Sequence, residues 1–370
     1  MTVAPLELNR DELLASHDYA EPLIVAGVRC HGGFDAEGTY RSPRTLVRAP
    51  AIEAWEARRA AEFGTPLLDV PLESWPAVFP NVEQSRLLIR RGAPEPVIAI
   101  LTRIGTVEGF GGLLRLLPIP DWRRCFDEDV RGTAVAHLGE GLFEAHARDE
   151  AGFGDEAGHD RMWFAARDLA FDHPLTEDQT EVMLGRMGLR STGSRPTAGS
   201  PGPGGTDRVL PDDIDPALEI VVRRMIGLLF IEIAAFHTFR WAEAVLGDPD
   251  LVAGEGEAGR IVSYIRADET PHVAYLRTAL SEMRDRTWVG SGGRRHDGAE
   301  LLGRLWDTAL TESTVLRRGA NLALAMREIE LALAGRVDRD DLIEELLSLG
   351  EVRRLPDGTL VDPDDPRYPG

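Results

Sequence analysis

Two Glu-x-x-His motifs stand out among the residues that could do chemistry: Glu156 with His159, and Glu269 with His272. Residues three apart on a helix lie on one face, so each motif points a carboxylate and an imidazole in the same direction. Bundles that hold two iron or manganese ions use one such pair on each of two helices, with single glutamates from two others. One pair alone is weak evidence, and further carboxylates are needed to indicate a metal site.

Glu232 is the most informative of these carboxylates. It lies within residues 225–236, which are apolar on nearly every side of a helix predicted over 215–246 and should therefore be buried. An ionised carboxylate in such a place is costly unless it is paired or bound to a metal. The alternative to a metal is an ion pair with an arginine such as Arg224 or Arg240.

The depth of Glu232 in its helix matches the depth of the second motif in the next helix. A return helix is predicted over 257–288, because apolar residues recur at helical spacing within residues 261–276. Glu232 lies roughly 22 Å before the end of its helix, and Glu269 lies roughly 20 Å into the return helix. In an antiparallel hairpin, Glu232, Glu269 and His272 should therefore meet. The alternative for this motif is a solvated helix face.

Three neighbours of these residues also bear on the chemistry. Pro271 lies inside the second motif and predicts a kink or a restart of the helix. Asp268 precedes Glu269 and is a candidate for orienting a ligand histidine. His237 is five residues from Glu232, so it faces elsewhere, and we assign it a structural or supporting role.

A second hairpin is predicted upstream, from a helix over 126–151 and another over 155–171. Glu144 lies roughly 10 Å from the end of the first helix, a depth that matches His159 and matches Glu156 less well. The alternative for Glu156 and His159 is a capping cluster, because acids suit the start of a helix.

The other histidines of this hairpin have structural interpretations. His137 and Glu140 share a stripe with Glu144, and His137 is expected to bond Glu140 rather than a metal. We assign His146 and His173 to the surface. Glu140 is kept as an alternative to Glu144 for the ligand from this helix.

The order of these residues resembles the Glu, Glu-x-x-His, Glu, Glu-x-x-His pattern of ferritin-like di-iron carboxylate proteins. Within them, the oxygenase branch that includes arylamine N-oxygenases is nearest, and the resemblance covers roughly residues 126–290. It implies two iron ions, with manganese as the alternative, that activate dioxygen with electrons from an external donor such as a reductase. The ligands it implies are Glu144, Glu156, His159, Glu232, Glu269 and His272.

The sequence departs from that pattern in one respect. The gap between Glu144 and the first Glu-x-x-His is much shorter than the usual spacing in these proteins. The first ligand is therefore left open between Glu144, Glu140 and an upstream acid such as Glu128.

Composition excludes several other classes of protein. All 41 basic residues are arginine, so chemistry that needs a lysine is excluded, including pyridoxal phosphate, P-loop and kinase mechanisms. The net charge of −21 argues against binding nucleic acid or an anionic membrane. Two cysteines give no disulfide framework and no zinc pattern. The chain lacks a long apolar run and its start lacks signal-peptide features, so we expect no membrane span and a cytoplasmic protein.

The expected fold is all-α, a ferritin-like four-helix bundle over residues 126–350 with extra helices. Residues 1–125 should form a mostly helical, irregular N-terminal region that packs on the bundle, with residues 31–40 as a loop. Glycine, proline and serine mark residues 191–207 as a flexible loop, and residues 351–370 as a tail that frays. A single last long helix is expected over residues 299–335.

The expected function is oxidation of a small organic substrate by a di-iron oxygenase, through N-oxygenation, hydroxylation or desaturation. No catalytic residue is expected beyond the metal ligands. A homodimer is left open. The alternatives are a non-catalytic helical binding or scaffold protein with buried charge pairs, and a hydrolase that uses the same carboxylates with a metal.

Overall fold

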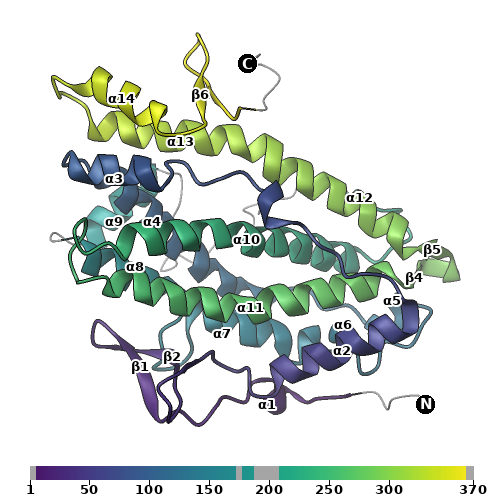
Figure 1. Cartoon of the computed structure of the whole chain (residues 1–370). Helices are drawn as coiled ribbons and strands as arrows, with labels where there is room; N and C mark the ends of the chain where they lie inside the picture. Colours follow the sequence, from purple (N-terminus) through teal and green to yellow (C-terminus); the bar gives the residue numbers. More distant parts are fainter. Residues whose placement is uncertain (1–5, 172–176, 187–207, 364–370) are drawn as a thin grey trace.

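Two long antiparallel helices lie side by side at the centre of the molecule (Figure 1). They are α10 (Pro216–Leu246) and α11 (Glu257–Arg284). The computed structural model describes residues 6–171, 177–186 and 208–363, and within these ranges the chain is mostly helical, as expected. Asp215 caps α10 by accepting the Ala217 N–H, and Pro216 occupies its first turn. The hairpin predicted from the apolar pattern is therefore present, and α11 continues across Pro271 without a restart.

Three further helices pack around this hairpin: α4 (Glu95–Gly109), α7 (Phe143–Ala151) and α8 (His159–Ala170). α4 packs against α8, and α8 packs against α11. Residues of the expected N-terminal region, those of α4, therefore pack directly on helices of the expected bundle.

The helix expected over residues 126–151 begins later, at Ala134, and is interrupted by a π-helical turn. Residues 126–133 are not helical, and a short helix α6 (Ala134–His137) leads into a π-helical turn, Leu138–Leu142, before α7 begins. The π-turn changes the helical register, so the stripe expected from His137 to Glu144 is lost. Gly141 permits a close approach here, because a Cβ atom on it would lie 2.8 Å from the Cβ of Leu13.

The start of α8 also differs from the expectation. The helix begins at His159 rather than at residue 155, and residues 152–158 form a loop. The loop closes on itself, because a Cβ atom on Gly158 would lie 2.3 Å from the backbone nitrogen of Gly152. Gly152 also has a φ of 73°, which favours glycine. Glu156 therefore lies in a loop, and the first Glu-x-x-His is not on one helix face.

Residues 31–40 are partly a sheet rather than a loop. Strands β1 (Glu21–Val25), β2 (Val28–Phe34) and β3 (Tyr40–Arg41) pair in antiparallel order. β2 also contacts the α7–α8 loop, because the Ala157 N–H donates to the carbonyl of Arg29. Together with α2 (Arg48–Phe63), which packs against α11, this sheet brings the N-terminal residues to the helical core.

The C-terminal residues cover one side of the hairpin (Figure 1). The last long helix is divided by a π-helical turn, Glu312–Leu316, into α12 (Gly298–Thr311) and α13 (Arg317–Ala332). The expected frayed tail is partly ordered, since a small hairpin buries Leu360 and Val361 against α13. The remaining elements are α1 (Arg10–Leu13), η1 (Leu72–Ser74), α3 (Val82–Arg90), η2 (Phe110–Leu116), α5 (Trp122–Cys125), α9 (Glu177–Arg186), β4 (Thr287–Val289), η4 (Ser291–Gly293), β5 (Arg295–Asp297), α14 (Arg339–Ser348), β6 (Arg353–Arg354) and β7 (Leu360–Val361).

Some expectations fall outside the described residues, namely the flexible loop at 191–207, the surface position of His173 and the last residues of the tail. Among the described residues, one helical segment, Glu95–Leu116, is long and apolar enough to cross a membrane. This is weak evidence, because core helices pass the same test, and α4 within it packs against α8 and α13.

Candidate metal centre

Seven side chains from α4, α7, α8, α10 and α11 converge in the interior. They form two groups of four, and the potential ligand atoms within each group lie within 4.8 Å of one another. Glu150 belongs to both groups and connects them. We name the groups the inner site, formed by His146, Glu150, Glu232 and His272, and the outer site, formed by Glu108, Glu150, His159 and Glu269.

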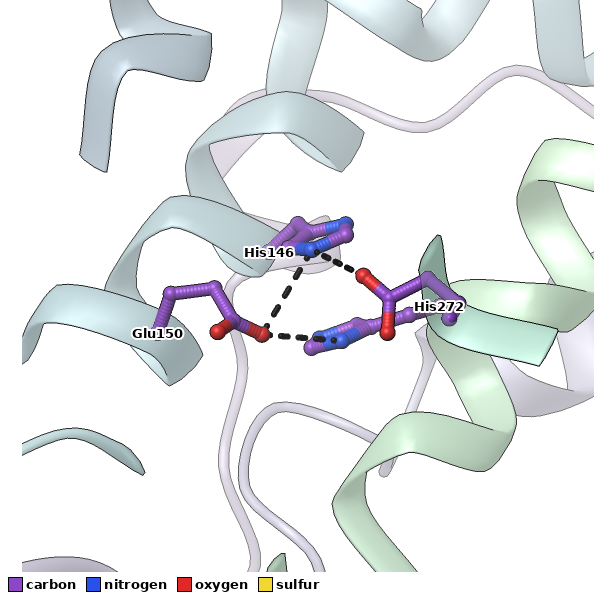
Figure 2. Close-up of side chains that lie close together, drawn as sticks. His146, Glu150 and His272 are labelled. Carbon is purple, nitrogen blue, oxygen red and sulfur yellow. Dashed lines mark ion pairs between the residues drawn. The ribbon is translucent and has the colours of Figure 1, made fainter. Parts of the chain in front are cut away.

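The inner site is fully enclosed, and its four residues are buried. Nε2 of His146 lies 3.1 Å from Oε1 of Glu232 and 3.5 Å from Oε1 of Glu150. Nδ1 of His272 lies 3.3 Å from the same Glu150 oxygen. Figure 2 shows the His146 and His272 rings facing each other beside Glu150, with centroids 3.7 Å apart. Ligands about 2.1 Å from one ion have donor atoms roughly 3.0–3.5 Å apart, so these spacings suit a cation.

The outer site is richer in oxygen and less enclosed. Nδ1 of His159 lies 2.9 Å from Oε1 of Glu269 and 3.3 Å from Oε1 of Glu150. Glu108, near the end of α4, completes the group and is only partly buried. Nδ1 of His272 lies 2.5 Å from Oε2 of Glu269, which places the two sites next to each other.

Four atoms of the two sites lack a hydrogen-bond partner among the residues that the structure describes. They are Nε2 of His146, Oε1 of Glu150, Nδ1 of His159 and Oε1 of Glu269. A buried polar atom without a partner costs roughly 1–3 kcal/mol, so such atoms are rare in folded proteins. These four are the atoms that face one another across the two sites. Cations between them would satisfy all four, and the donor set therefore fits metal ions.

The cluster contains four glutamates and three histidines, and burial changes the pKa values of several of them. Burial raises the pKa of Glu150 well above its usual value, and the neighbouring Glu269 and Glu108 raise it further. Burial also raises the pKa of Glu269 well above its usual value, with Glu232 adding to the effect. The pKa of His272 is lowered to about 3 by burial and by the nearby His146. Bound cations would reverse the preference of the two glutamates, because they stabilise ionised carboxylates, and they would bind His272 in the neutral form that it already favours.

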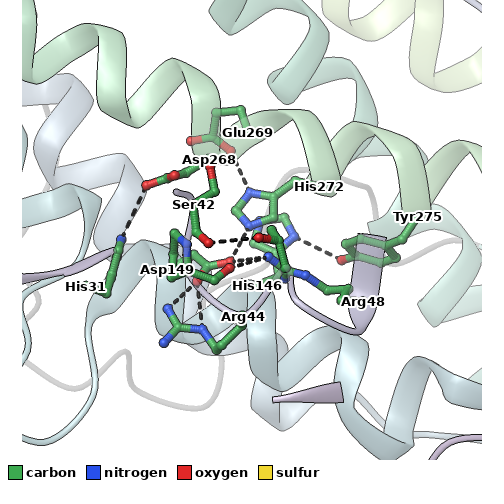
Figure 3. A network of polar contacts seen from close by, with 12 residues as sticks. His31, Ser42, Arg44, Arg48, His146, Asp149, Asp268, Glu269, His272 and Tyr275 are labelled. Carbon is green, nitrogen blue, oxygen red and sulfur yellow. Dashed lines mark hydrogen bonds and ion pairs between the residues drawn. The ribbon is translucent and has the colours of Figure 1, made fainter. Parts of the chain in front are cut away.

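His146 and His272 each have the second ring nitrogen held by another side chain (Figure 3). Nε2 of His272 donates to Oδ2 of Asp149 at 2.9 Å, and Nδ1 of His146 lies 2.9 Å from the Tyr275 hydroxyl. A carboxylate only accepts hydrogen bonds, so Nε2 of His272 carries the proton and the lone pair of Nδ1 faces Oε2 of Glu269, where a cation could bind between them. Such partners fix the tautomer and orientation of metal-binding histidines.

The structure brings together four residues that the sequence predicted as ligands: His159, Glu232, Glu269 and His272. Asp268 lies beside them, with Oδ2 3.4 Å from Nε2 of His159, where it can orient that ring as proposed.

The structure does not bring the other predicted residues to the cluster. Glu144 instead forms ion pairs with Arg10, Arg115 and Arg148, because the π-turn and α7 orient it away from the centre. Glu156 pairs with Arg29 from its position in the loop. Neither Glu144 nor Glu156 therefore lies in the two four-residue groups, contrary to the expectation.

The alternatives to Glu144 also lie elsewhere. Glu140 is exposed, and Glu128 accepts from the backbone and hydroxyl of Thr287. His137 stacks on Trp55, and its ring bonds the backbone at Thr133 and Leu8 rather than Glu140. His237 donates to the carbonyl of Leu72, a structural role.

Sequence reasoning missed Glu108, His146 and Glu150. His146 was assigned to the surface but is fully buried. His146 and Glu150 are four residues apart on one helix, a spacing that could have identified them as a pair. Glu108 follows an apolar stretch of helix, which is the same signal that identified Glu232.

Comparisons with family models, with curated proteins and with solved structures find no match for this chain. The interpretation of the centre therefore rests on its own geometry and chemistry.

Proposed function

We propose that this protein is a ferritin-like di-iron oxygenase that uses dioxygen to oxidise a small organic substrate. The observation that carries the proposal is the pair of buried four-residue groups that share Glu150 and point unpartnered oxygen and nitrogen atoms at one another. A helical core that positions carboxylates and histidines from several helices is the arrangement in which di-iron carboxylate proteins hold their metals.

Charge and donor type both favour two divalent transition metals. When ionised, the four glutamates of the cluster carry four negative charges, which two divalent cations neutralise. A neutral total is important because uncompensated charge in an interior is costly. Mixed carboxylate and imidazole donors suit iron, with manganese as the alternative, whereas magnesium prefers oxygen ligands and retained water.

The chain's own residues would prepare and protect the centre. Glu150 would connect the two metal positions, and the apolar side chains around Glu232, including Leu229 and Ile233, would keep water away from it. Glu108 is the least buried of the seven side chains, so the outer site is the side from which dioxygen and substrate would approach. A bound iron pair would supply dioxygen reduction, with electrons from an external donor such as a reductase. The reaction would be N-oxygenation, hydroxylation or desaturation.

Metal analysis of protein from iron-supplied cells tests this proposal. We expect about two irons per chain, as in other di-iron bundles. Substitution Glu232→Ala or His272→Ala should remove at least one of them, whereas Glu140→Ala, at an exposed acid, should not. A chain that contains less than about half an iron, unchanged by either substitution, would overturn the proposal. Oxygen consumption with a reductant and substrate separates an oxygenase from a metal-dependent hydrolase, which consumes none.

A further inference from the structure

Four side chains from the N-terminal residues reach the edge of the metal centre. They are His31 from β2, Tyr40 from β3, Arg44 from the segment that follows, and Arg48 at the start of α2. We name them the N-terminal clamp. His31, Arg44 and Arg48 are buried, and Tyr40 is partly buried. Figure 3 shows His31 beside Asp268, and Arg44 and Arg48 beside Asp149.

One arm of the clamp holds Asp149. Nε of Arg44 donates to Oδ1 of Asp149 at 2.8 Å, and Nη2 of Arg44 contacts the same oxygen. Nη2 of Arg48 donates to Oδ2 at 2.9 Å. That oxygen also accepts from Nε2 of His272 at 2.9 Å. Asp149 is thus fixed by two arginines and in turn fixes the ring of a candidate ligand.

The other arm holds Asp268. The Tyr40 hydroxyl lies 2.9 Å from Oδ2 and 3.1 Å from Oδ1 of Asp268. Nε2 of His31 lies 3.7 Å from Oδ2, and Nε2 of His159 lies 3.4 Å from it. Asp268 is therefore placed between the clamp and a second candidate ligand.

The two arms are built alike, because each holds an aspartate that contacts a histidine on another helix. Each aspartate directly precedes a glutamate of the centre, since Asp149 precedes Glu150 and Asp268 precedes Glu269. Asp149, on α7, holds a histidine of α11, whereas Asp268, on α11, holds His159 of α8. The aspartates therefore connect the helices that supply the metal ligands.

The backbone of the clamp is itself constrained. Arg44 has a φ of 52°, a left-handed conformation that is uncommon for a residue other than glycine. Such conformations cost of order 1 kcal/mol, persist where surrounding contacts fix them, and cluster at functional sites. Here the contacts of the Arg44 side chain with Asp149 provide that constraint.

We propose that Tyr40, Arg44 and Arg48 are positioning residues of the metal centre, which hold Asp268 and Asp149 so that Nδ1 of His159 and of His272 faces the cations. This inference rests on the proposed function, because it requires that metal ions bind at the centre. It assigns a role to the N-terminal residues, which complete the support of two ligands.

The test compares Asp149→Asn and Tyr40→Phe with the wild-type chain and with Tyr264→Phe. Tyr264 is a matched control because its ring packs against Tyr40, with centroids 4.6 Å apart. The measurements are the affinity for Co²⁺, the visible absorption spectrum of the Co²⁺-loaded protein and the melting temperature of the metal-free protein. The spectrum reports ligand geometry directly, which a purely structural role would not change.

We expect Asp149→Asn to weaken Co²⁺ binding roughly 10–100-fold, the usual effect of removing a partner of a metal-binding histidine. Tyr40→Phe should weaken binding less and should still change the spectrum, with the melting temperature almost unchanged. Tyr264→Phe should bind like the wild type. If Asp149→Asn fails to fold, the Co²⁺ affinity and the spectrum of Tyr40→Phe test the positioning role alone.

The positioning role is overturned if Tyr40→Phe, and Asp149→Asn where it folds, bind Co²⁺ with the affinity and the spectrum of the wild type. That result would leave the proposed metal centre itself unaffected. If the wild-type chain itself binds neither Co²⁺ nor iron, the proposed function fails together with this inference.

Discussion

Asp149 and Glu150 are neighbours in the chain and both are buried, yet their surroundings move their pKa values in opposite directions. Burial would raise the pKa of Asp149, but Arg44 and Arg48 hold it well below its usual value. Burial raises the pKa of Glu150 well above its usual value, and Glu269 and Glu108 raise it further. Asp149 thus has two arginines beside it, whereas the nearest charged groups to Glu150 are other glutamates and the histidines of the centre.

This difference separates two uses of a buried acid. Asp149 has a fixed partner on each oxygen, so it serves as an anchor for His272. Oε1 of Glu150 has no hydrogen-bond partner in the described part of the chain, and it faces histidines of both sites. The missing positive charge is what the proposed cations would provide. Cation binding would therefore add to the free energy of unfolding.

Substitution Glu150→Gln should produce the largest effect on metal binding. The side chain belongs to both sites, so we expect metal content to fall from about two ions per chain to nearly none. The metal-free variant should be as stable as the metal-free wild type to within about 1 kcal/mol, because an amide resembles the protonated acid that burial favours there. Retention of two ions by this variant, measured by elemental analysis, would contradict the shared role of Glu150.

Substitution Asp149→Ala should differ from Glu150→Gln by destabilising the metal-free protein. It leaves two buried guanidinium groups without their carboxylate, and breaking a buried ion pair in this way costs roughly 3–5 kcal/mol. Denaturant unfolding of the metal-free protein measures this loss. Equal stability of the metal-free Asp149→Ala and Glu150→Gln variants would remove the distinction between the two residues.

Glu282 is an intermediate case, and it predicts a pH dependence. Burial raises its pKa to about 7, although Arg286 and the N–H groups of Val135 and Ala134 favour the ionised form. A raised pKa means that the folded chain binds more protons than the unfolded chain between about pH 4.5 and pH 7, so stability should fall as pH rises through that range.

The size of that effect follows from the pKa difference. The difference between the usual pKa of 4.5 and a pKa of about 7 corresponds to roughly 3 kcal/mol. The variant Glu282→Gln cannot ionise and should lose this part of the pH dependence. Parallel unfolding curves at pH 5 and pH 8 provide the comparison, and an equal pH dependence in both proteins would show that Glu282 does not titrate in this range.

The smallest effects should come from the two acids that the sequence selected and the structure places elsewhere. Glu144 and Glu156 form ion pairs with arginines near the surface, and such pairs contribute about 0–1 kcal/mol. Glu144→Gln and Glu156→Gln should therefore retain full metal content and nearly full stability. A loss of metal in either variant would show that the centre extends beyond the seven residues.

The α10–α11 hairpin could be predicted from the sequence because both helices are regular. A constant rise per residue converts position into depth, and the depths of Glu232 and Glu269 then placed them together. The same calculation failed for the other hairpin. The π-turn before α7 and the loop before α8 break the regular relation between sequence spacing and direction.

The ligands from α4 and α7 could not be ranked for the same reason. The sequence contains Asp-Glu-Ala-Gly twice, at residues 149–152 and 155–158, and only the second copy has a histidine three residues after its glutamate. Sequence spacing therefore indicated Glu156 as the partner of His159. In the structure, the loop brings Glu150 next to His159 instead. The clamp was also beyond prediction, because its contacts with Asp149 and Asp268 join residues more than a hundred positions apart.

The closed loop between α7 and α8 has a consequence for how the centre could change through insertion and deletion. Gly152 and Gly158 meet, so removal of residues 153–158 would leave Glu150, Ala151, Gly152 and His159 as an unbroken Glu-x-x-His sequence. Residues 153–158 form a closed loop whose two ends lie close together, and Ala157 of this loop also pairs with β2. Chain length can therefore vary inside a ligand motif while the donors keep their places, and a search by spacing alone will overlook such a motif.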